Sequence, residues 1–132
     1  MGNPPFVANA GRTANNEQHS KGMQNDEQKA DRTALFGKDG GILDYVACWY
    51  KKAAEYMKGT QISAAFVSTN SICQGQQVAP LWKPLFADGI KINFAHQTFK
   101  WDSESSQGAM VFVVIVGFSY LQNKTPKLFS KN

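Results

Sequence analysis

The fold of this 132-residue chain is decided by LDYVACWYKKAAEYM at residues 43–57, followed closely by ISAAFV at residues 62–67. In the first stretch, apolar residues recur every three to four positions, which predicts an amphipathic helix with a buried face of Leu43, Val46, Ala47, Tyr50, Ala53, Ala54 and Met57. Gly59 then ends the helix. The second stretch is short and almost wholly apolar, as is typical of a strand buried on both faces of a parallel sheet.

The alternation of helices and strands continues along the chain. A second helix is expected over 78–87, then a strand over 90–95 and a longer, more apolar strand over 110–118. A helix between two strands implies that the strands run parallel, whereas the last two strands are joined by the polar segment 98–108 and are free to pair antiparallel. The pattern therefore predicts an α/β fold with about three strands.

The chain is expected to form one domain over residues 1–120, followed by a polar tail over 121–132. Within the domain, residues 8–41 are expected to be a mobile loop region that contains a short helix over 26–36, because Met23 is the only large apolar residue between positions 8 and 32. A loop of this length can cover an active site, touch DNA or be disordered, and the sequence leaves these alternatives open.

Composition narrows the function classes. The net charge of +4 suits a polyanionic partner, but the basic residues are scattered, and most are expected to lie on a solvated surface. Cys48 and Cys73 have no CxxC or His-rich spacing, which favours reduced thiols over metal ligands, so no metal is expected. The longest apolar stretch, 109–118, is far too short to span a bilayer, and no signal peptide is recognised. We therefore expect a cytoplasmic protein without a membrane partner.

The chemistry is concentrated in Asn3-Pro4-Pro5-Phe6. An exocyclic amine on a purine is a poor nucleophile because its lone pair is delocalised into the ring. Two acceptors placed on its N–H bonds, the side-chain oxygen of Asn3 and the backbone carbonyl of Pro4, would localise that lone pair without a general base. The prolines fix the backbone, and Phe6 offers a face on which a base could stack. A base reaches such a pocket only after it leaves the duplex. A plain turn or extended linker is the alternative reading.

Further candidates lie at the ends of the predicted strands. Ser68 and Asn70 leave the first strand at its carboxyl end, where α/β sheets bind ligands, and they either line the pocket or simply cap a loop. Phe99 lies in the predicted loop 98–108, where exposure and stacking are plausible. His96 is interpreted as a structural histidine rather than a base.

These segments resemble a known family. Gly2-Asn3-Pro4-Pro5-Phe6-Val7, Leu43-Asp44-Tyr45-Val46-Ala47, Ala65-Phe66-Val67-Ser68-Thr69-Asn70-Ser71-Ile72 and Ile92-Asn93-Phe94-Ala95-His96 are similar to the methyltransferase part of large single-chain restriction–modification enzymes of bacteria, which modify adenine N6. The resemblance runs from residue 2 to about residue 120. It implies the carboxyl-terminal portion of a Rossmann-like, class I S-adenosylmethionine-dependent methyltransferase sheet, with the last strand inserted antiparallel.

The resemblance assigns Asn3, Pro4, Pro5 and Phe6 to the target adenine, and gives Phe99 as a second stacking face. It implies double-stranded DNA as partner and S-adenosylmethionine as cofactor. The family's cofactor loop precedes the Asn-Pro-Pro motif, so the cofactor site is expected in a missing amino-terminal half and not in this chain. The motif departs from the family after Phe6, where a glycine usually follows within three residues.

Two alternatives remain beside a fragment of an adenine methyltransferase. The chain could be a truncated remnant that is inactive alone, because it lacks the part that positions the methyl donor. It could also belong to enzymes that methylate a protein glutamine amide. Without its neighbouring strand, the strand over 62–67 is expected to expose an apolar edge, which predicts self-association.

Overall fold

The computed structural model describes residues 1–7, 24–101, 111–122 and 125–130. It contains the helices α1 (Asp26–Phe36), α2 (Val46–Met57) and α3 (Val78–Ala87), with short 3-10 turns η3 (Gly37–Gly40), η4 (Asn70–Cys73) and η5 (Gly75–Gln77). The strands are β1 (Ser63–Thr69), β2 (Lys91–Trp101), β3 (Val111–Ser119) and β4 (Lys127–Phe129). The predicted loop over 8–41 lies outside the described residues from 8 to 23, whereas its predicted helix forms as α1.

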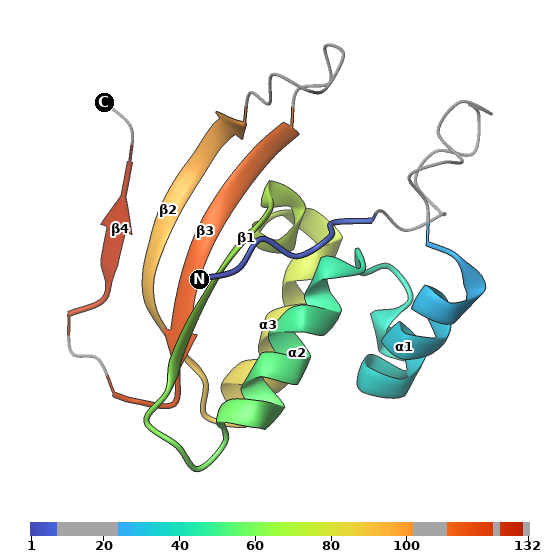
Figure 1. Cartoon of the computed structure of the whole chain (residues 1–132), viewed down its shortest axis with the longest axis horizontal. Helices are drawn as coiled ribbons and strands as arrows, with labels where there is room; N and C mark the ends of the chain where they lie inside the picture. Colours follow the sequence, from blue (N-terminus) through green and yellow to red (C-terminus); the bar gives the residue numbers. More distant parts are fainter. Residues whose placement is uncertain (8–23, 102–110, 123–124, 131–132) are drawn as a thin grey trace.

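The four strands form one mixed sheet in the order β1-β3-β2-β4 (Figure 1). β3 pairs antiparallel with β1 on one side and with β2 on the other, so β1 and β2 run parallel with β3 inserted between them. This arrangement confirms the predicted α/β fold, including the antiparallel last core strand. The fourth strand, β4, adds three residues parallel to the outer edge of β2.

One face of the sheet is covered by α2 and α3, and α1 packs on α2 (Figure 1). The core between the sheet and the two helices is aromatic at its centre, where the Tyr50 ring contacts the rings of Phe66, Trp82 and Phe118 at centroid distances of 5.2, 5.4 and 5.3 Å. Each of these rings comes from a different element, so Tyr50 joins α2 to β1, α3 and β3 in one hydrophobic core.

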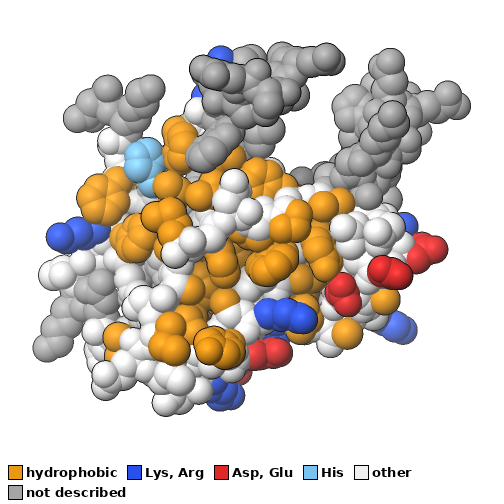
Figure 2. Space-filling view, viewed as in Figure 1, with side chains coloured by type: hydrophobic (Ala, Val, Ile, Leu, Met, Phe, Trp, Pro, Cys, Tyr) orange, Lys and Arg blue, Asp and Glu red, His pale blue; other side chains and the backbone are white. Residues whose placement is uncertain are grey.

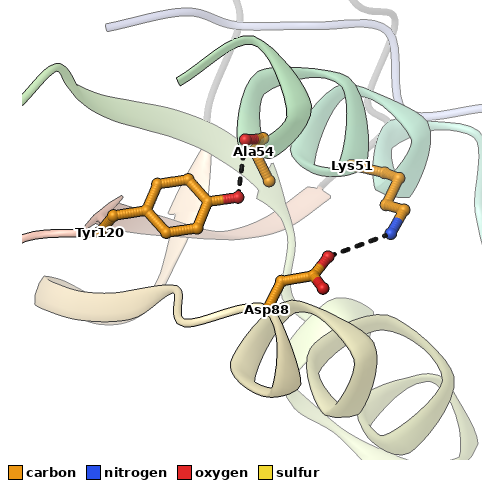
Figure 3. Close-up of polar contacts among 4 residues, drawn as sticks. All are labelled: Lys51, Ala54, Asp88 and Tyr120. Atoms are coloured by element: carbon orange, nitrogen blue, oxygen red, sulfur yellow. Dashed lines mark hydrogen bonds and ion pairs between the residues drawn. The ribbon is translucent and has the colours of Figure 1, made fainter. Parts of the chain in front are cut away.

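Two polar contacts tie the middle and the carboxyl-terminal part of α2 to neighbouring segments (Figure 3). The Tyr120 hydroxyl, just after β3, donates a hydrogen bond of 2.8 Å to the backbone carbonyl of Ala54, and the Lys51 ammonium lies 3.7 Å from the Asp88 carboxylate at the end of α3. Because Ala54 is buried, its carbonyl has no solvent to bond instead. The tyrosine bond therefore matters more than the ion pair, which is partly exposed to solvent.

α1 begins with a reciprocal capping box. The Asn25 side-chain oxygen accepts a hydrogen bond of 2.8 Å from the backbone N–H of Gln28, and the Gln28 side-chain oxygen accepts one of 2.9 Å from the backbone N–H of Asn25. Gly37 ends the helix at a φ of 66°, which a residue with a side chain rarely adopts.

Two sequence predictions about the carboxyl-terminal part of the chain were wrong. Phe99 lies in β2 rather than in a loop, because β2 continues past Ala95 through a bulge between His96 and Phe99 that breaks the two-residue alternation. Within the predicted polar tail, residues 127–129 form β4, although all three are exposed. Hydrophobic patterning misses such a strand, because its backbone ladder to β2 rather than burial holds it.

Gly117 of β3 carries a packing constraint that can be tested. The ring of Phe94, its register partner on β2, lies directly over it, and a Cβ built at position 117 would stand 2.1–2.6 Å from three ring atoms. Gly117→Ala should therefore push Phe94 from its place against Phe129 and destabilise the fold by about 1–3 kcal/mol, measured by chemical denaturation. In a Phe94→Ala background the same change should cost little, and an equal cost in both backgrounds would contradict the ring contact.

Candidate functional site at the carboxyl end of the sheet

The Asn3-Pro4-Pro5-Phe6 motif starts from a single bridging residue beside β1. Gly2 pairs in parallel with Phe66: its N–H donates to the Ala65 carbonyl at 2.8 Å, and its carbonyl accepts from the Val67 N–H at 2.9 Å. A Cβ at position 2 would stand 3.1 Å from the Phe66 ring, so glycine permits this close approach. The motif thus leaves β1 in the direction of the strand's carboxyl end.

The four motif residues alternate in exposure. Asn3 and Pro5 are exposed, Pro4 is buried, and Phe6 is half-buried against the core. The buried proline fixes the local backbone while the Asn3 amide stays accessible to a ligand. Phe6 already uses part of its surface in the core, so only the remainder of the ring is available to a base.

The far end of the motif is also tied down. The Val7 carbonyl accepts a bond of 2.9 Å from the Tyr45 N–H at the start of α2, and a longer one of 3.4 Å from the Gln24 side chain. Gln24 also donates to the Leu43 carbonyl at 2.9 Å, and the buried Arg32 donates to Gln24 at 2.7 Å. The motif is therefore held at Gly2 by the sheet and at Val7 by a helix.

Sequence reasoning missed Gln24 and Arg32. Both lie in the segment interpreted as a mobile loop, and both are polar residues that carry no periodic signal. Their contribution is visible only once the chain is folded, because Gln24 bonds to backbone carbonyls 17 and 19 residues away and Arg32 bonds to the Gln24 side chain.

The carboxyl end of β1 and the turn η4 that follows it lie at the same sheet edge, and their residues differ in access. Ser68 is fully buried, with its hydroxyl 2.6 Å from that of Tyr50, which argues against direct contact with a substrate. Thr69 and Asn70 are half-buried, and Asn70 opens η4. Asn70 is therefore better placed than Ser68 to reach a ligand.

A buried carboxylate stands behind this loop. Asp44 is 4% exposed, and its Oδ2 atom accepts a bond of 2.8 Å from the Ser71 hydroxyl and a long one of 3.5 Å from Thr69. Its backbone N–H donates to the Gln77 side chain at 2.9 Å. A helix-start acid reads from sequence as a simple partner of the helix dipole, so this cluster was not anticipated.

Phe99 lies near the carboxyl end of β2, opposite Val113 of β3, and its ring meets His96 edge-on at a centroid distance of 5.0 Å. Because β1 and β2 are parallel, the motif and Phe99 stand at the same edge of the sheet. They are three strand spacings apart, because the motif lies outside β1 and β3 stands between β1 and β2, which makes about 14 Å across the sheet. His96 bonds through Nδ1 to the Gln97 carbonyl at 2.7 Å, which fits the structural role expected of it.

Nucleophilic and metal chemistry find little support among the described residues. Burial raises the pKa of the Cys48 thiol to about 11, so this thiol stays protonated at neutral pH. No group of three or more His, Cys, Asp or Glu side chains in the described ranges could hold a metal ion. In the same ranges, no helix has both the length and the apolar character needed to cross a membrane.

The cavities found among the described residues lie elsewhere. Four are described, the largest about 660 Å³ between α1, α2 and α3, and none of these four is lined by residues 2–7. Among the described residues, Asn3 and Pro5 are exposed, so these two motif residues face outward rather than into one of the four cavities.

Comparisons with known proteins agree with the sequence resemblance. A curated relative, DNA methyltransferase A of Bacillus subtilis (strain 168), is 43% identical over 129 residues, which cover 96% of this chain and 13% of the relative. In a solved structure of the Type IIL restriction-modification enzyme MmeI in complex with DNA, the matching region has a TM-score of 0.82 and 44% identity, and covers 98% of this chain and 16% of that one.

The chain thus spans less than a fifth of the length of either protein. The family described as "MmeI, DNA-methyltransferase domain" matches residues 1–130, nearly the whole sequence. Together with the fold and the position of the motif, this match shows that the chain belongs to the family of MmeI DNA-methyltransferase domains.

Proposed function

We propose that this chain forms the target-base side of an adenine-N6 DNA methyltransferase of restriction–modification type. The observation that carries the proposal is the anchored motif: Asn3-Pro4-Pro5-Phe6 stands at the carboxyl edge of the sheet, bonded at Gly2 to β1 and at Val7 to the start of α2. The exposed Asn3 amide and the fixed backbone of Pro4 supply acceptors for an amine from two adjacent residues.

The chain's residues would act on the base in two ways. Asn3 Oδ1 and the Pro4 carbonyl accept the two N–H bonds of the adenine amine and localise its lone pair. Phe6 stacks on the ring with the part of its face left free by the core, a contact typically worth about 1–3 kcal/mol. Phe99 stands at the same edge of the sheet, but at about 14 Å across the sheet it is too far away to stack on the other face of the same base. No group in this scheme has to remove a proton before the amine attacks.

The methyl donor would be held mainly by polypeptide outside this chain. S-adenosylmethionine supplies an electrophilic methyl group when bound, but residues 2–7 line none of the four described cavities. The relatives carry more than four-fifths of their length outside the matched region, which leaves room for such a site.

The names of the relatives favour DNA over a protein glutamine as substrate. A polyanionic partner also agrees with the net charge of +4. The direct test is the modified residue itself, since N6-methyladenine and a methylated glutamine amide are distinguished by mass spectrometry of digested products. Methylated cytosine would contradict the adenine assignment.

Asn3→Ala should reduce methyl transfer by about 10²–10³-fold, because it removes one of two preorganised acceptors. The change is best made in a chimera, in which this chain replaces the matching segment of the B. subtilis relative, and measured as label transferred from S-adenosylmethionine to DNA. Cofactor affinity should stay the same. Asp88→Ala is the matched control: it removes the partly exposed ion pair with Lys51, which is remote from the motif, and should change stability by at most about 1 kcal/mol without affecting transfer. Undiminished transfer by Asn3→Ala would refute the role of Asn3.

The isolated chain should be inactive and should self-associate. The outer edge of β1 bonds only to Gly2 among the described residues, and hydrophobic side chains gather over the centre of the face in Figure 2. Calorimetric titration with S-adenosylmethionine should detect no tight binding, and sedimentation should show oligomers. Micromolar cofactor affinity would overturn the first expectation, and a monodisperse monomer the second.

A further inference from the structure

Asp44 is the buried acidic group that the proposed chemistry leaves without a task. A carboxylate that is 4% exposed is costly to bury unless hydrogen bonds satisfy it. Here the Ser71 hydroxyl donates to its Oδ2 at 2.8 Å, a short bond to a charged acceptor, and the Thr69 hydroxyl lies 3.5 Å from the same atom. The Ser71 and Thr69 oxygens are 3.0 Å from each other, so the three groups form one cluster.

The two hydroxyls flank Asn70 in sequence. Holding residues 69 and 71 to one carboxylate oxygen fixes the turn from β1 into η4, and with it the backbone that carries the Asn70 amide. Asn70 itself is half-buried, unlike the fully buried Ser68. Because the motif takes both N–H bonds of the adenine amine, the Asn70 amide contributes its N–H donors, which match the ring-nitrogen acceptors beside that amine.

Asp44 is also tied to the motif through its neighbour. The Tyr45 N–H bonds to the Val7 carbonyl at 2.9 Å, so adjacent residues at the start of α2 hold the motif segment and the loop after β1. The Asp44 N–H donates to the buried Gln77 side chain at 2.9 Å, which fixes this pair against the start of α3. Two adjacent residues at the start of α2 therefore anchor both the segment that carries Asn3 and the turn that carries Asn70.

We propose that Asp44 is a positioning residue for the target base: through Ser71 and Thr69 it holds Asn70 where its amide meets the edge of the adenine whose amine the motif binds. This inference rests on the proposed function. It gives Asn70 a role in base selection. It also gives Asp44 a role beyond the favourable interaction that any acid near a helix N-terminus makes with the helix dipole.

The test uses the chimera described above. Asp44→Asn keeps the side-chain shape but weakens the bond from Ser71, and should lower the single-turnover rate of methyl transfer about tenfold. The KM for DNA should change by less than about twofold, because phosphate contacts dominate DNA affinity, and S-adenosylmethionine affinity should be unchanged. Asn70→Ala should reproduce this split between rate and affinity.

A double-mutant cycle separates positioning from general damage. Ser71→Ala alone should slow transfer to a similar extent, and the combination with Asp44→Asn should be no slower than the slower single variant, since both remove one bond. Asp88→Ala should leave the rate per active site at the wild-type value. If Asp44→Asn fails to fold, Ser71→Ala and Thr69→Val, which keep the carboxylate, decide the question.

The outcomes distinguish this inference from the proposed function. If the unaltered chimera transfers no methyl group, or if Asn3→Ala is harmless, the proposed function fails. If Asn3→Ala abolishes transfer while Ser71→Ala, Thr69→Val and Asn70→Ala keep the wild-type rate, the positioning role fails and the proposed function stands. Additive losses in the cycle would likewise overturn the coupling between Asp44 and Ser71.

Discussion

The structure depends on one buried residue, Tyr50 of α2. Its ring contacts aromatic rings from β1, α3 and β3, and such pairs contribute about 0.5–1.5 kcal/mol each beyond simple burial. Its hydroxyl would be costly at this depth without a partner, and the Ser68 hydroxyl at 2.6 Å is that partner. Burial also raises the pKa of Tyr50, so the phenol stays neutral and the bond persists.

The packing of Tyr50 also positions the start of α2, about one and a half helical turns before it in the chain. With Tyr50 fixed against Ser68, the start of α2 is brought to the carboxyl end of β1, where Asp44 meets Ser71 and Tyr45 meets Val7. The helix N-terminus needs partners for its free N–H groups, and the carbonyl of Val7 supplies one of them. The same bond that completes the helix thus holds the motif, so the local stability of α2 and the geometry of the candidate site have a common origin.

The sequence predicted elements with strong periodicity and missed contacts between distant polar groups. α3 begins and ends where predicted, and α2 forms inside the predicted stretch 43–57, because apolar spacing and the glycines that follow are local signals. α1 also has its predicted bounds, although its apolar periodicity is weak. β2 was predicted too short because a bulge near His96 interrupts its alternation, and β4 was missed because none of its residues is buried. The motif was recognisable from four residues, whereas Gln24, Arg32 and the bonds of Asp44 depend on side chains that meet only after folding.

This short segment can keep the same fold as its relatives because the residues of its hydrophobic core all come from the segment itself. The buried cluster draws on α2, α3, β1 and β3, all within the matched region, which fits a TM-score of 0.82 to a solved relative at 44% identity. Among the described residues, Asn3 is exposed and the outer edge of β1 pairs only with Gly2. Both features lie on the side of the sheet where Gly2 enters. One neighbouring strand paired along that edge would extend the single Gly2 bridge into a ladder, and would bring new side chains beside the motif at the same time.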